Sequence, residues 1–471
     1  MREKVFVGPR IRALRDRKGL TLDACAKQLG LSTSYLSQIE TNQRPITARV
    51  LIALSRFFGV NPVEFDTDEE SRLVADLREA TADLGLDAPA AGLAELKHAA
   101  ATTPSLARQF LALHRAYRAL DERLMRFDET VRMRSEDAPD SLIPYQEVRD
   151  FFHYRDNYVD ELDVAAEDIA GQIGVGGDAD VVTVLERALA DRFGIRVLRQ
   201  ESPDPGFVRR YDPATRIVTL GRDLAEPTRA FQLATQLGSL SFAPLFENVV
   251  ATAGLKSATA RDIARIALGN YAAGALLMPY RQFAASALAL RHDIEQLQHR
   301  HTASFEQVAH RLSTLQRPGA RGVPFYFVRV DQAGNITKRH SSTRFQFARF
   351  GGACPLWNVH EAFGHPGRIL VQLAEMPDGV RYLCIGRSIV KRSGNYLQPN
   401  RHYAIGIGCE VAYADQVVYS EGMRLDGAAV PVGVSCRICE RPNCHQRAYP
   451  PLDRRLVVDP HERRVVPYAI E

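Results

Sequence analysis

The sequence contains no long hydrophobic run. No apolar stretch approaches the roughly 20 residues that a membrane-spanning helix requires, and the first residues, MREKVFVGPRIRALRDRKG, have no apolar core of the kind found in a secretory signal peptide. These absences argue against an integral membrane or secreted protein. We therefore expect a soluble cytoplasmic protein with no membrane partner.

Cysteine is also scarce, with 7 residues in a chain of 471. Thiols in the cytoplasm are mostly kept reduced, so disulfides are not expected. Three of the seven, Cys436, Cys439 and Cys444, nevertheless lie close together in SCRICERPNCHQRAYPP. Such a local group in a reducing compartment indicates a bound metal or metal cluster.

Most of the chain has no excess of charge of either sign. The formal net charge is only +4, and residues 1–66 hold 11 Lys and Arg against 6 Asp and Glu, so the remainder is close to neutral. The positive excess therefore lies in the first segment, which predicts an anionic partner there.

The first segment has the pattern of a small helical bundle. An amphipathic helix in GPRIRALRDRKG is followed by TLDACAKQLG, which Thr21 caps, and by STSYLSQIE, which Ser32 caps, with a tight turn at Gly30 between them. This is a helix-turn-helix, whose third helix would lie in the major groove of an operator in double-stranded DNA. The residues expected to face the DNA are Thr33, Ser34, Tyr35, Gln38 and Arg44.

The stretch RALRDRKGLTLDACAKQLGLSTSYLSQIETNQRPIT resembles the Xre-type, phage-repressor-like helix-turn-helix. In that family an arginine of the first helix pairs with the glutamate that ends the third, which implies a structural pair between Arg15 and Glu40. The alternative is a helical hairpin that packs without binding DNA.

Residues 67–140 are rich in Ala, Leu, Glu and Arg at helical spacing, as in EESRLVADLREATADL and SLARQFLALHRAYRALDERLMRFDE. This composition predicts a helical connector. Its apolar stripes offer the alternative of dimerisation, and we expect a homodimer or homotetramer.

Residues 141–315 combine helices with two strand-like pieces, GIRVLRQ and RIVTLGR. The pair TRAFQLATQLGSLSF and RIALGNYAAGALLMPY resembles the ImmA/IrrE metallopeptidase-like domain. The HExxH positions of that family hold Thr235, Gln236 and Ser239 here, and residues 266–268 of the second helix are Ile, Ala and Leu. Zinc-dependent peptide hydrolysis needs imidazole or carboxylate ligands and a glutamate general base at these positions. We therefore predict no enzyme activity. A peptidase that uses a displaced metal is the alternative.

A degenerate active site can still bind a small molecule. Arginines and phenols suit phosphates and a thioester carbonyl, although each such residue could equally be a surface or core group. The candidate ligand-binding residues are Tyr158, Arg209, Arg210, Arg229 and Tyr271.

From residue 316 to 471 the sequence alternates in β-branched and aromatic residues, as in VPFYFVRVDQAG and HYAIGIGCEVAYADQVVY. The predicted fold class is therefore a multidomain α+β protein. It has an all-α helix-turn-helix domain, a helical connector, a degenerate metallopeptidase-like domain and a mixed, mainly-β C-terminal domain.

The spacing C-x2-C-x4-C supplies three ligands, so a fourth must come from elsewhere. Cys25 and Cys384 look embedded in a helix and a strand, and Cys409 shares its strand parity with the apolar Ile405 and Ile407. Cys354 lies between a glycine pair and a proline, so we favour it, with Cys409 as the alternative. Four thiolates suit either a [4Fe-4S] cluster or structural zinc, to which His445 could also contribute. The remaining possibility is a group of reduced thiols without metal.

Taken together, these segments and the motifs GGACPLWNVHEAF and VGVSCRICERPNCHQRAYPPL resemble the short-chain fatty acyl transcriptional regulators over essentially the whole chain. The resemblance implies a DNA-binding regulator of genes for propionyl-CoA, acetyl-CoA or related metabolism. It also implies an acyl-CoA effector bound in the ImmA-like region and a [4Fe-4S] cluster in the last domain. The alternative is a redox or iron sensor in which the state of the cluster is the input.

Overall fold

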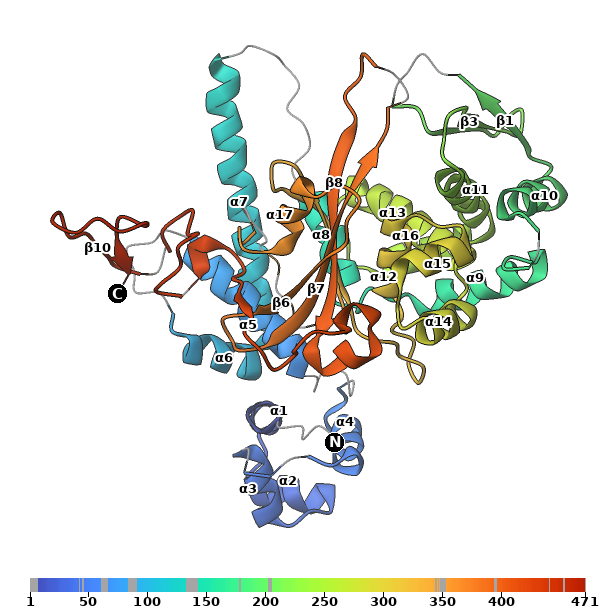
Figure 1. The fold of residues 1–471 in the computed structure, drawn as a ribbon. Helices are drawn as coiled ribbons and strands as arrows, with labels where there is room; N and C mark the ends of the chain where they lie inside the picture. The colour runs from blue at the N-terminus through green and yellow to red at the C-terminus, as the bar shows by residue number, and fades with distance from the viewer. Residues whose placement is uncertain are drawn as a thin grey trace. The chain divides into compact units, whose positions relative to one another are not determined.

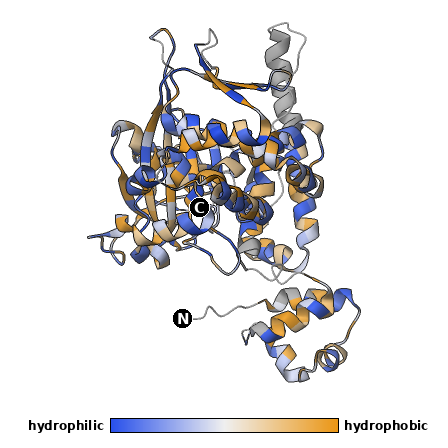
Figure 2. Cartoon of the chain, turned by 90° about the vertical axis from the view of Figure 1, so that its right-hand side faces the viewer, coloured by the Kyte–Doolittle hydropathy of each residue, from blue (hydrophilic) through white to orange (hydrophobic). Residues whose placement is uncertain are grey.

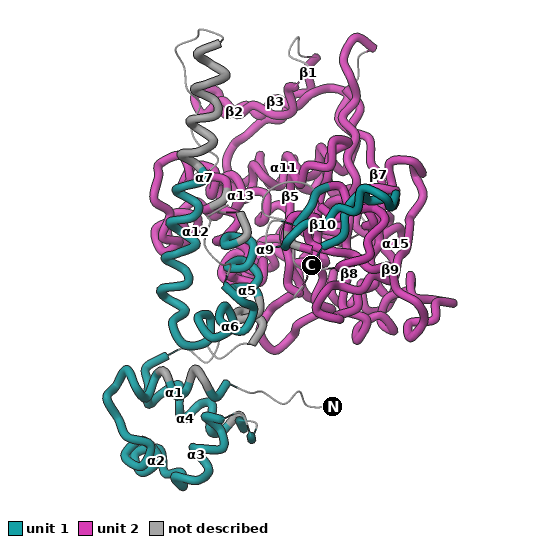
Figure 3. The backbone as a smooth tube through the Cα atoms, turned by 90° about the vertical axis from the view of Figure 1, so that its left-hand side faces the viewer, with its two compact units in different colours: residues 1–141, 449–471 teal, residues 142–448 magenta. Residues whose placement is uncertain are grey.

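The computed structural model describes two compact units (Figure 3). Unit 1 comprises residues 1–141 and 449–471, and unit 2 comprises residues 142–448. The predicted boundaries at residues 66 and 140, and the glycine pair before Cys354, lie outside the described part. The structure describes all residues except 1–6, 42, 45, 61–66, 84–90, 133–142, 178, 202–205, 344, 346, 348–352, 394–395, 440, 452–453 and 471.

The predicted helix-turn-helix is present in unit 1. Thr21 and Ser32 cap the second and third helices, because each hydroxyl accepts a hydrogen bond of 3.2 Å from the amide three residues on. Gly30 ends the second helix at a φ of +66°, a left-handed conformation that glycine adopts without strain. Ile11, Leu36 and Ile39 lie in the shared core. The helices are α1 (Gly8–Arg17), α2 (Leu22–Leu29), α3 (Thr33–Glu40) and α4 (Ala48–Phe58).

The connector is helical, as predicted. It contains α5 (Thr67–Asp83), α6 (Leu93–Thr102) and α7 (Pro104–Arg132). Leu77, Leu96 and Leu111 meet in a small core between these three helices. Near the C-terminus, β10 (Leu456–Val457) pairs antiparallel with β11 (Ala469–Ile470) in the same unit.

The first half of unit 2 is mainly helical. Its helices are α8 (Ile143–His153), α9 (Asp160–Ile173), α10 (Val181–Phe193), α11 (Glu226–Ser241), α12 (Ala243–Thr252), α13 (Ala258–Leu277), α14 (Tyr280–Ala289), α15 (Ile294–His301) and α16 (Phe305–Leu312). The small sheet has the order β1-β3-β2, from β1 (Arg196–Gln200), β2 (Arg209–Asp212) and β3 (Ile217–Gly221). The strands β1 and β3 were predicted, whereas β2 was not.

The second half of unit 2 is built on a six-stranded sheet of order β5-β4-β8-β7-β6-β9 (Figure 1). All neighbouring strands are antiparallel except β6 and β9. The α+β fold class is therefore confirmed. The strands are β4 (Tyr326–Asp331), β5 (Ile336–Ser341), β6 (Leu370–Glu375), β7 (Arg381–Lys391), β8 (Arg401–Glu410) and β9 (Val430–Pro431). The short helices are α17 (Asn358–Glu361), η2 (Ala362–Gly364), η3 (Val411–Gln416), η4 (Val418–Ser420) and η5 (Cys436–Ile438).

One hydrophobic core joins the two halves of unit 2. Phe327, Leu383 and Ile405 on one face of the sheet pack in the same cluster as the buried residues of α9 to α16. The opposite face has its own cluster, which includes Tyr326 and Trp357. In Figure 2 hydrophobic and hydrophilic stretches alternate along the helices, as expected for amphipathic segments. Because of the shared core, the segments predicted as separate domains fold together between residues 142 and 448. None of the described helices is long and apolar enough to cross a membrane.

Candidate functional site

The third helix of the helix-turn-helix presents a polar surface at its N-terminal end. Ser34 is exposed, whereas Thr33 is half-buried and its hydroxyl donates a 3.0 Å hydrogen bond to Asp23 of α2. Tyr35 and Gln38 are half-buried on the same helix. Ser34 therefore has the freest side chain of the predicted contacts on α3, while Thr33 is held by the preceding helix.

Arg44 follows α3 and lies against it. Its guanidinium is 4.9 Å from the centroid of the Tyr35 ring, a cation–π contact, and its amide donates to the carbonyl of Gln38 at 3.1 Å. The Arg44 side chain is nevertheless exposed. The structure thus brings all five predicted DNA contacts to α3 and the turn that follows it.

The helices α11 and α13 pack tightly where the related metallopeptidases would hold a metal. The hydroxyls of Thr235 and Ser239 each donate a 2.7 Å hydrogen bond to the carbonyl four residues earlier in α11. A methyl group at Gly269 of α13 would lie 3.4 Å from the Ser239 hydroxyl and 3.6 Å from the Thr235 methyl. These side chains are therefore engaged by their own helix and covered by the backbone of α13.

Both predicted ligand-binding tyrosines belong to an ionic network around the buried Asp163 of α9. The Tyr271 hydroxyl donates to the Asp163 carboxylate at 2.6 Å, and Arg311 donates to both carboxylate oxygens at 2.7 and 3.0 Å. Asp163 and Arg311 are almost fully buried. Burial by itself would lower the pKa of Arg311, but the Asp163 charge outweighs it and raises the pKa.

Tyr158 lies at the edge of the same network. Its hydroxyl donates to Asp160 at 2.7 Å and accepts from Arg317 at 2.9 Å, and Arg317 also pairs with Glu167 at 2.8 Å. Burial is the main cause that raises the pKa of Tyr158, so the phenol stays protonated. The structure thus joins Tyr158 and Tyr271 through Asp163 and Arg317.

The three predicted arginines lie on β2 and in the first turn of α11. Arg209 of β2 donates to the carbonyl of Gln232 at 3.1 Å, and Arg229 donates to the carbonyl of Leu224 at 3.1 Å. Burial lowers the pKa of Arg209. Arg210 lies over the ring of Phe207, with 5.6 Å to the centroid. Among the described residues, no hydrogen bond or ion pair connects these arginines to the Asp163 network.

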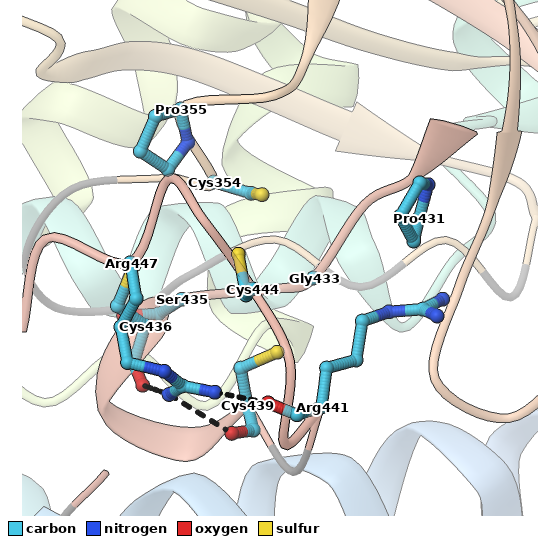
Figure 4. A pocket seen from close by; sticks show the side chains of 10 residues that line it. All are labelled: Cys354, Pro355, Pro431, Gly433, Ser435, Cys436, Cys439, Arg441, Cys444 and Arg447. Carbon is cyan, nitrogen blue, oxygen red and sulfur yellow. Dashed lines mark hydrogen bonds between the residues drawn. The ribbon is translucent and has the colours of Figure 1, made fainter. Parts of the chain in front are cut away.

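The four cysteines predicted as metal ligands line one pocket in unit 2. Its space of about 290 Å³, part of which is open to solvent, lies between Cys354 and the chain that includes η5. In Figure 4 the sulfur atoms of Cys354, Cys439 and Cys444 point toward the same space. The other residues that line the pocket are Pro355, Pro431, Gly433, Ser435, Cys436, Arg441 and Arg447.

Backbone amides approach two of these sulfur atoms. The amide of Ala448 donates to the Cys436 sulfur at 3.4 Å. Burial raises the pKa of the Cys354 thiol, while hydrogen bonds from the amides of Gly433 and Leu356 act in the opposite direction. A methyl group at Gly433 would lie 2.9 Å from the Cys439 sulfur, so only glycine fits there without a shift. The chain is therefore packed directly around the thiols.

Arg447 holds the C-x2-C turn in place. Its guanidinium donates to the carbonyls of Cys436 and Cys439 at 3.3 Å each and to the carbonyl of Arg441. Arg441 in turn donates to the carbonyl of Glu375 in β6 at 2.6 Å, which ties this turn to the sheet. Both arginines border the pocket and bring positive charge close to the thiols.

The remaining cysteines lie in hydrophobic cores. Cys409 is in the core of unit 2 with Ile405 and Ile407, as its parity predicted, and Cys25 is in the core of the helix-turn-helix. Cys384 is buried on the opposite face of the sheet, where burial raises its pKa to about 12. None of the three lines the pocket. Among the residues that the structure describes, no three His, Cys, Asp or Glu side chains are grouped closely enough to hold a metal ion.

Some of these residues could not be found from the sequence. Asp163 and Arg311 are 148 positions apart and carry no local motif. Arg447 lies three residues after Cys444 in the sequence, and this closeness to the cysteine group was the signal that could have identified it.

The fold and these sites define a helix-turn-helix transcriptional regulator with a metallopeptidase-like middle segment. Three family descriptions match: "Helix-turn-helix" at residues 11–65, "IrrE N-terminal-like domain" at 190–313, and "Short-chain fatty acyl coenzyme A regulator, C-terminal" at 314–468. The chain belongs to the family of short-chain fatty acyl coenzyme A regulators.

Several relatives are similar over almost the whole chain. The chain is 51% identical to the propionyl-CoA carboxylase regulator of Cereibacter sphaeroides over 100% of both chains. It is 43% identical to the HTH-type transcriptional regulators RamB and PrpR of Mycobacterium tuberculosis, over 99% of this chain and 99% and 96% of theirs. A solved Mycobacterium tuberculosis transcriptional regulator matches with a TM-score of 0.66 and 46% identity, over 69% of this chain and 99% of its own. The relatives are regulators, which confirms the prediction that the chain is not an enzyme.

Proposed function

We propose that this regulator controls genes of short-chain acyl-CoA metabolism and that an acyl-CoA sets its affinity for the operator. The observation that carries the proposal is a capped helix-turn-helix in the same chain as a metallopeptidase fold whose metal-ligand positions hold Thr235, Gln236 and Ser239. Such a fold cannot act as a zinc peptidase but can serve as a binding domain. The names of the relatives support the metabolic assignment.

The chemistry of the effector fits the polar groups of the middle segment. A coenzyme A thioester carries phosphates, which arginines such as Arg209, Arg210 and Arg229 bind well, and a carbonyl that a phenol can donate to. Tyr271 is committed to Asp163, and Tyr158 to Asp160, so the three arginines are the stronger candidates. An acyl-CoA can change DNA affinity only if it binds the DNA-competent arrangement and the other arrangement with different affinity.

The effector proposal is tested by titrating a labelled duplex from the chain's own promoter at fixed salt, with acetyl-, propionyl- and butyryl-CoA in turn. Coupling of this kind usually changes affinity by roughly 5- to 150-fold. Free coenzyme A is the matched control for the acyl group. Identical DNA affinity under all conditions would remove the acyl-CoA from the proposal and leave the DNA-binding function in place.

We also propose that Cys354, Cys436, Cys439 and Cys444 hold a [4Fe-4S] cluster. Four thiols line one pocket, which is the number of ligands that such a cluster needs. Among the described residues they are not grouped closely enough to hold a single ion, as the alternative, zinc, requires. Amides that donate to sulfur and two bordering arginines would balance the negative charge of the thiolates. When bound, the cluster would supply a redox-active cross-link, because Cys354 precedes α17 while the other three follow β9.

A redox or iron sensor is the second candidate. It is favoured by the partial exposure of Cys436 and Cys444, which gives oxidants access to one side of the pocket. Anaerobic purification followed by iron, sulfide and zinc analysis identifies the metal. Operator binding by the loaded and the stripped protein then separates the two roles: equal affinity indicates a structural cluster, and a difference indicates a sensor.

Self-association is proposed through the outward face of α7. Leu106 and Leu113 are 62% and 69% exposed and lie seven residues apart, and Tyr117 continues the stripe at 46% exposure. The sequence repeats an apolar residue at the same spacing at Leu120 and Phe127. A seven-residue repeat matches a paired helix, so a second copy of this chain is the occupant we propose. A twofold dimer would also suit a palindromic operator.

A further inference from the structure

The strands β7 and β8 extend beyond the rest of the sheet. β6 pairs with β7 only as far as Gly386, and β4 pairs with β8 only from Tyr403 onward. β7 and β8 stay paired with each other up to Lys391 and Arg401. The far end is therefore a two-stranded ribbon, which Figure 1 shows near the β8 label. We call the described residues of this ribbon and its tip, 387–393 and 396–403, the β7–β8 arm.

The end of this arm carries positive charge only. Between residues 388 and 409 the sequence has Lys391, Arg392 and Arg401 but no Asp or Glu. Lys391 lies directly opposite Arg401, and like charges at such a position destabilise a strand pair. Lys391 pairs with Glu306 at 2.6 Å. Arg392 and Arg401 are exposed and form no ion pair with any residue in the described part of the chain. Two cations at the tip thus have no counter-charge there.

Two large apolar side chains lie between these arginines at the tip. Tyr396 is 101% exposed and Leu397 is 86% exposed. Hydrogen bonds from Ser393 hold the two sides of the tip together. Its amide donates to the Asn400 side chain at 3.0 Å, and its hydroxyl donates to the Gln398 carbonyl at 2.8 Å. The exposed Tyr396 ring, Arg392 and Arg401 therefore lie beside residues that are joined by hydrogen bonds across the tip.

We propose that the β7–β8 arm is a second DNA-contacting element that binds duplex next to the site of the helix-turn-helix. Arg392 and Arg401 would lie against phosphates, and Tyr396 and Leu397 would enter the minor groove. Two-stranded ribbons fit DNA grooves, and apolar side chains at such tips can wedge between base steps. The inference rests on the chain binding DNA through its helix-turn-helix. A second copy fits this surface less well, because it would bring identical cations together.

The test uses the full chain, purified anaerobically, and two duplexes from its promoter: the operator core, and the core with about 10 bp added on each side. Wild type should bind the longer duplex more tightly. The double variant R392A/R401A should lose roughly tenfold in affinity for the longer duplex at 0.15 M salt, and its log–log salt slope should fall by about 2. The exposed pair R281A/R368A is the matched control and should change neither quantity.

The apolar tip has a separate signature. The double variant Y396A/L397A should lose the gain from the added flanks while keeping the wild-type salt slope, because it removes no phosphate contact. The inference is overturned if R392A/R401A binds both duplexes like wild type. It is also overturned if the arm variants change the oligomeric mass in light scattering, since the surface would then belong to a second copy. Failure of wild type to bind even the core would instead overturn the proposed function.

Discussion

Arg15 and Glu40 form a two-point ion pair that joins the first and third helices of the helix-turn-helix. Nε of Arg15 lies 2.7 Å from Oε1 of Glu40, and Nη2 lies 2.9 Å from Oε2. The side chains are only 11% and 6% exposed. Arg15 also donates to the carbonyl of Leu20 at 2.9 Å, so the pair fixes both the start of the turn and the end of α3. The orientation of the DNA-facing helix therefore depends on this contact.

Removing one partner of this pair should lower the free energy of unfolding of the helix-turn-helix domain. Arg15→Ala leaves the Glu40 carboxylate buried without its counter-charge, at a cost of about 3 kcal/mol in the free energy of unfolding. Urea denaturation followed by circular dichroism measures the loss, and operator binding should weaken with it. Arg12→Ala is the matched control, because Arg12 and Asp16 are 67% and 59% exposed and 4.0 Å apart. A loss as small as that of the control would contradict the structural role of Arg15.

The choice of Cys354 as the fourth ligand can be tested against Cys409. Cys354→Ser should abolish bound iron and sulfide and the visible absorption of the anaerobic protein, whereas Cys409→Ala should retain them. Trp357 gives a second readout, because it is the single tryptophan of the chain, is 2% exposed and lies three residues after Cys354. A cluster so close should quench its fluorescence, and the emission should rise when the cluster is removed.

The reverse pattern would contradict the proposed ligand set. A Cys354→Ser protein with full iron content would exclude that thiol, and zinc in place of iron would select the alternative metal. Gly433→Ala offers a milder variant that keeps all four thiols. Its methyl group would lie 2.9 Å from the Cys439 sulfur, so the yield of loaded protein should fall.

Local signals made much of this architecture predictable. Thr21 and Ser32 are good helix caps, so both helix starts follow from adjacent residues. The alternation around Cys409 also placed it in the core correctly, because side chains in a strand alternate between two faces. The strand β2 was missed, since three of its four residues, Arg209–Asp212, are charged and give no apolar alternation over such a short stretch.

Contacts between distant residues were not predictable in the same way. The Asp163 network joins α9, α13 and α16, and its arginines look like surface residues in the sequence. The expectation that Tyr271 faces a ligand had the same origin, because a phenol on an apolar helix does not reveal its partner. Cys354 was one of four candidates for the fourth thiol, and only the folded chain brings it to the pocket with the other three.

The outward face of α7 should control the oligomeric state. Replacing Leu106 and Leu113 by Ser removes two exposed apolar side chains from the proposed helix pair, so the fraction of dimer should fall without a loss of helical content. Sedimentation or light scattering over a range of concentrations measures the mass. The double variant of Ile266 and Leu288 to Ser is the control, since these residues are 66% and 65% exposed elsewhere. Unchanged association would rule out this face.

The role of Tyr271 can be separated into stability and effector binding. Tyr271→Phe removes the hydroxyl that donates to Asp163 and accepts from the Val159 amide at 3.1 Å. We expect a loss of about 2 kcal/mol in stability, because a hydrogen bond to a buried charge is removed. Acyl-CoA affinity should stay within about twofold if the phenol serves only the network. A large loss of acyl-CoA affinity with unchanged stability would instead place Tyr271 in the effector site.

Stability should fall below neutral pH partly because of His301. This side chain is 8% exposed, lies 5.1 Å from the ring of Phe283 and has no hydrogen-bond partner at Nε2. Burial, assisted by the charges of Arg300 and Arg311, lowers the pKa of His301 from 6.5 to about 4. Between these two values the unfolded chain binds a proton that the folded chain does not, so stability falls as the pH is lowered from 6.5 toward 4.

The expected size of this effect is about 1 kcal/mol between pH 7.5 and pH 5.5. Urea denaturation of wild type and His301→Gln at both pH values isolates it, because the other buried histidines contribute equally to both proteins. The variant should lose less stability than wild type over this interval. The exposed His461→Gln is the control and should keep the wild-type dependence on pH. Equal pH dependence of wild type and His301→Gln would show that His301 is protonated in the folded protein at pH 5.5.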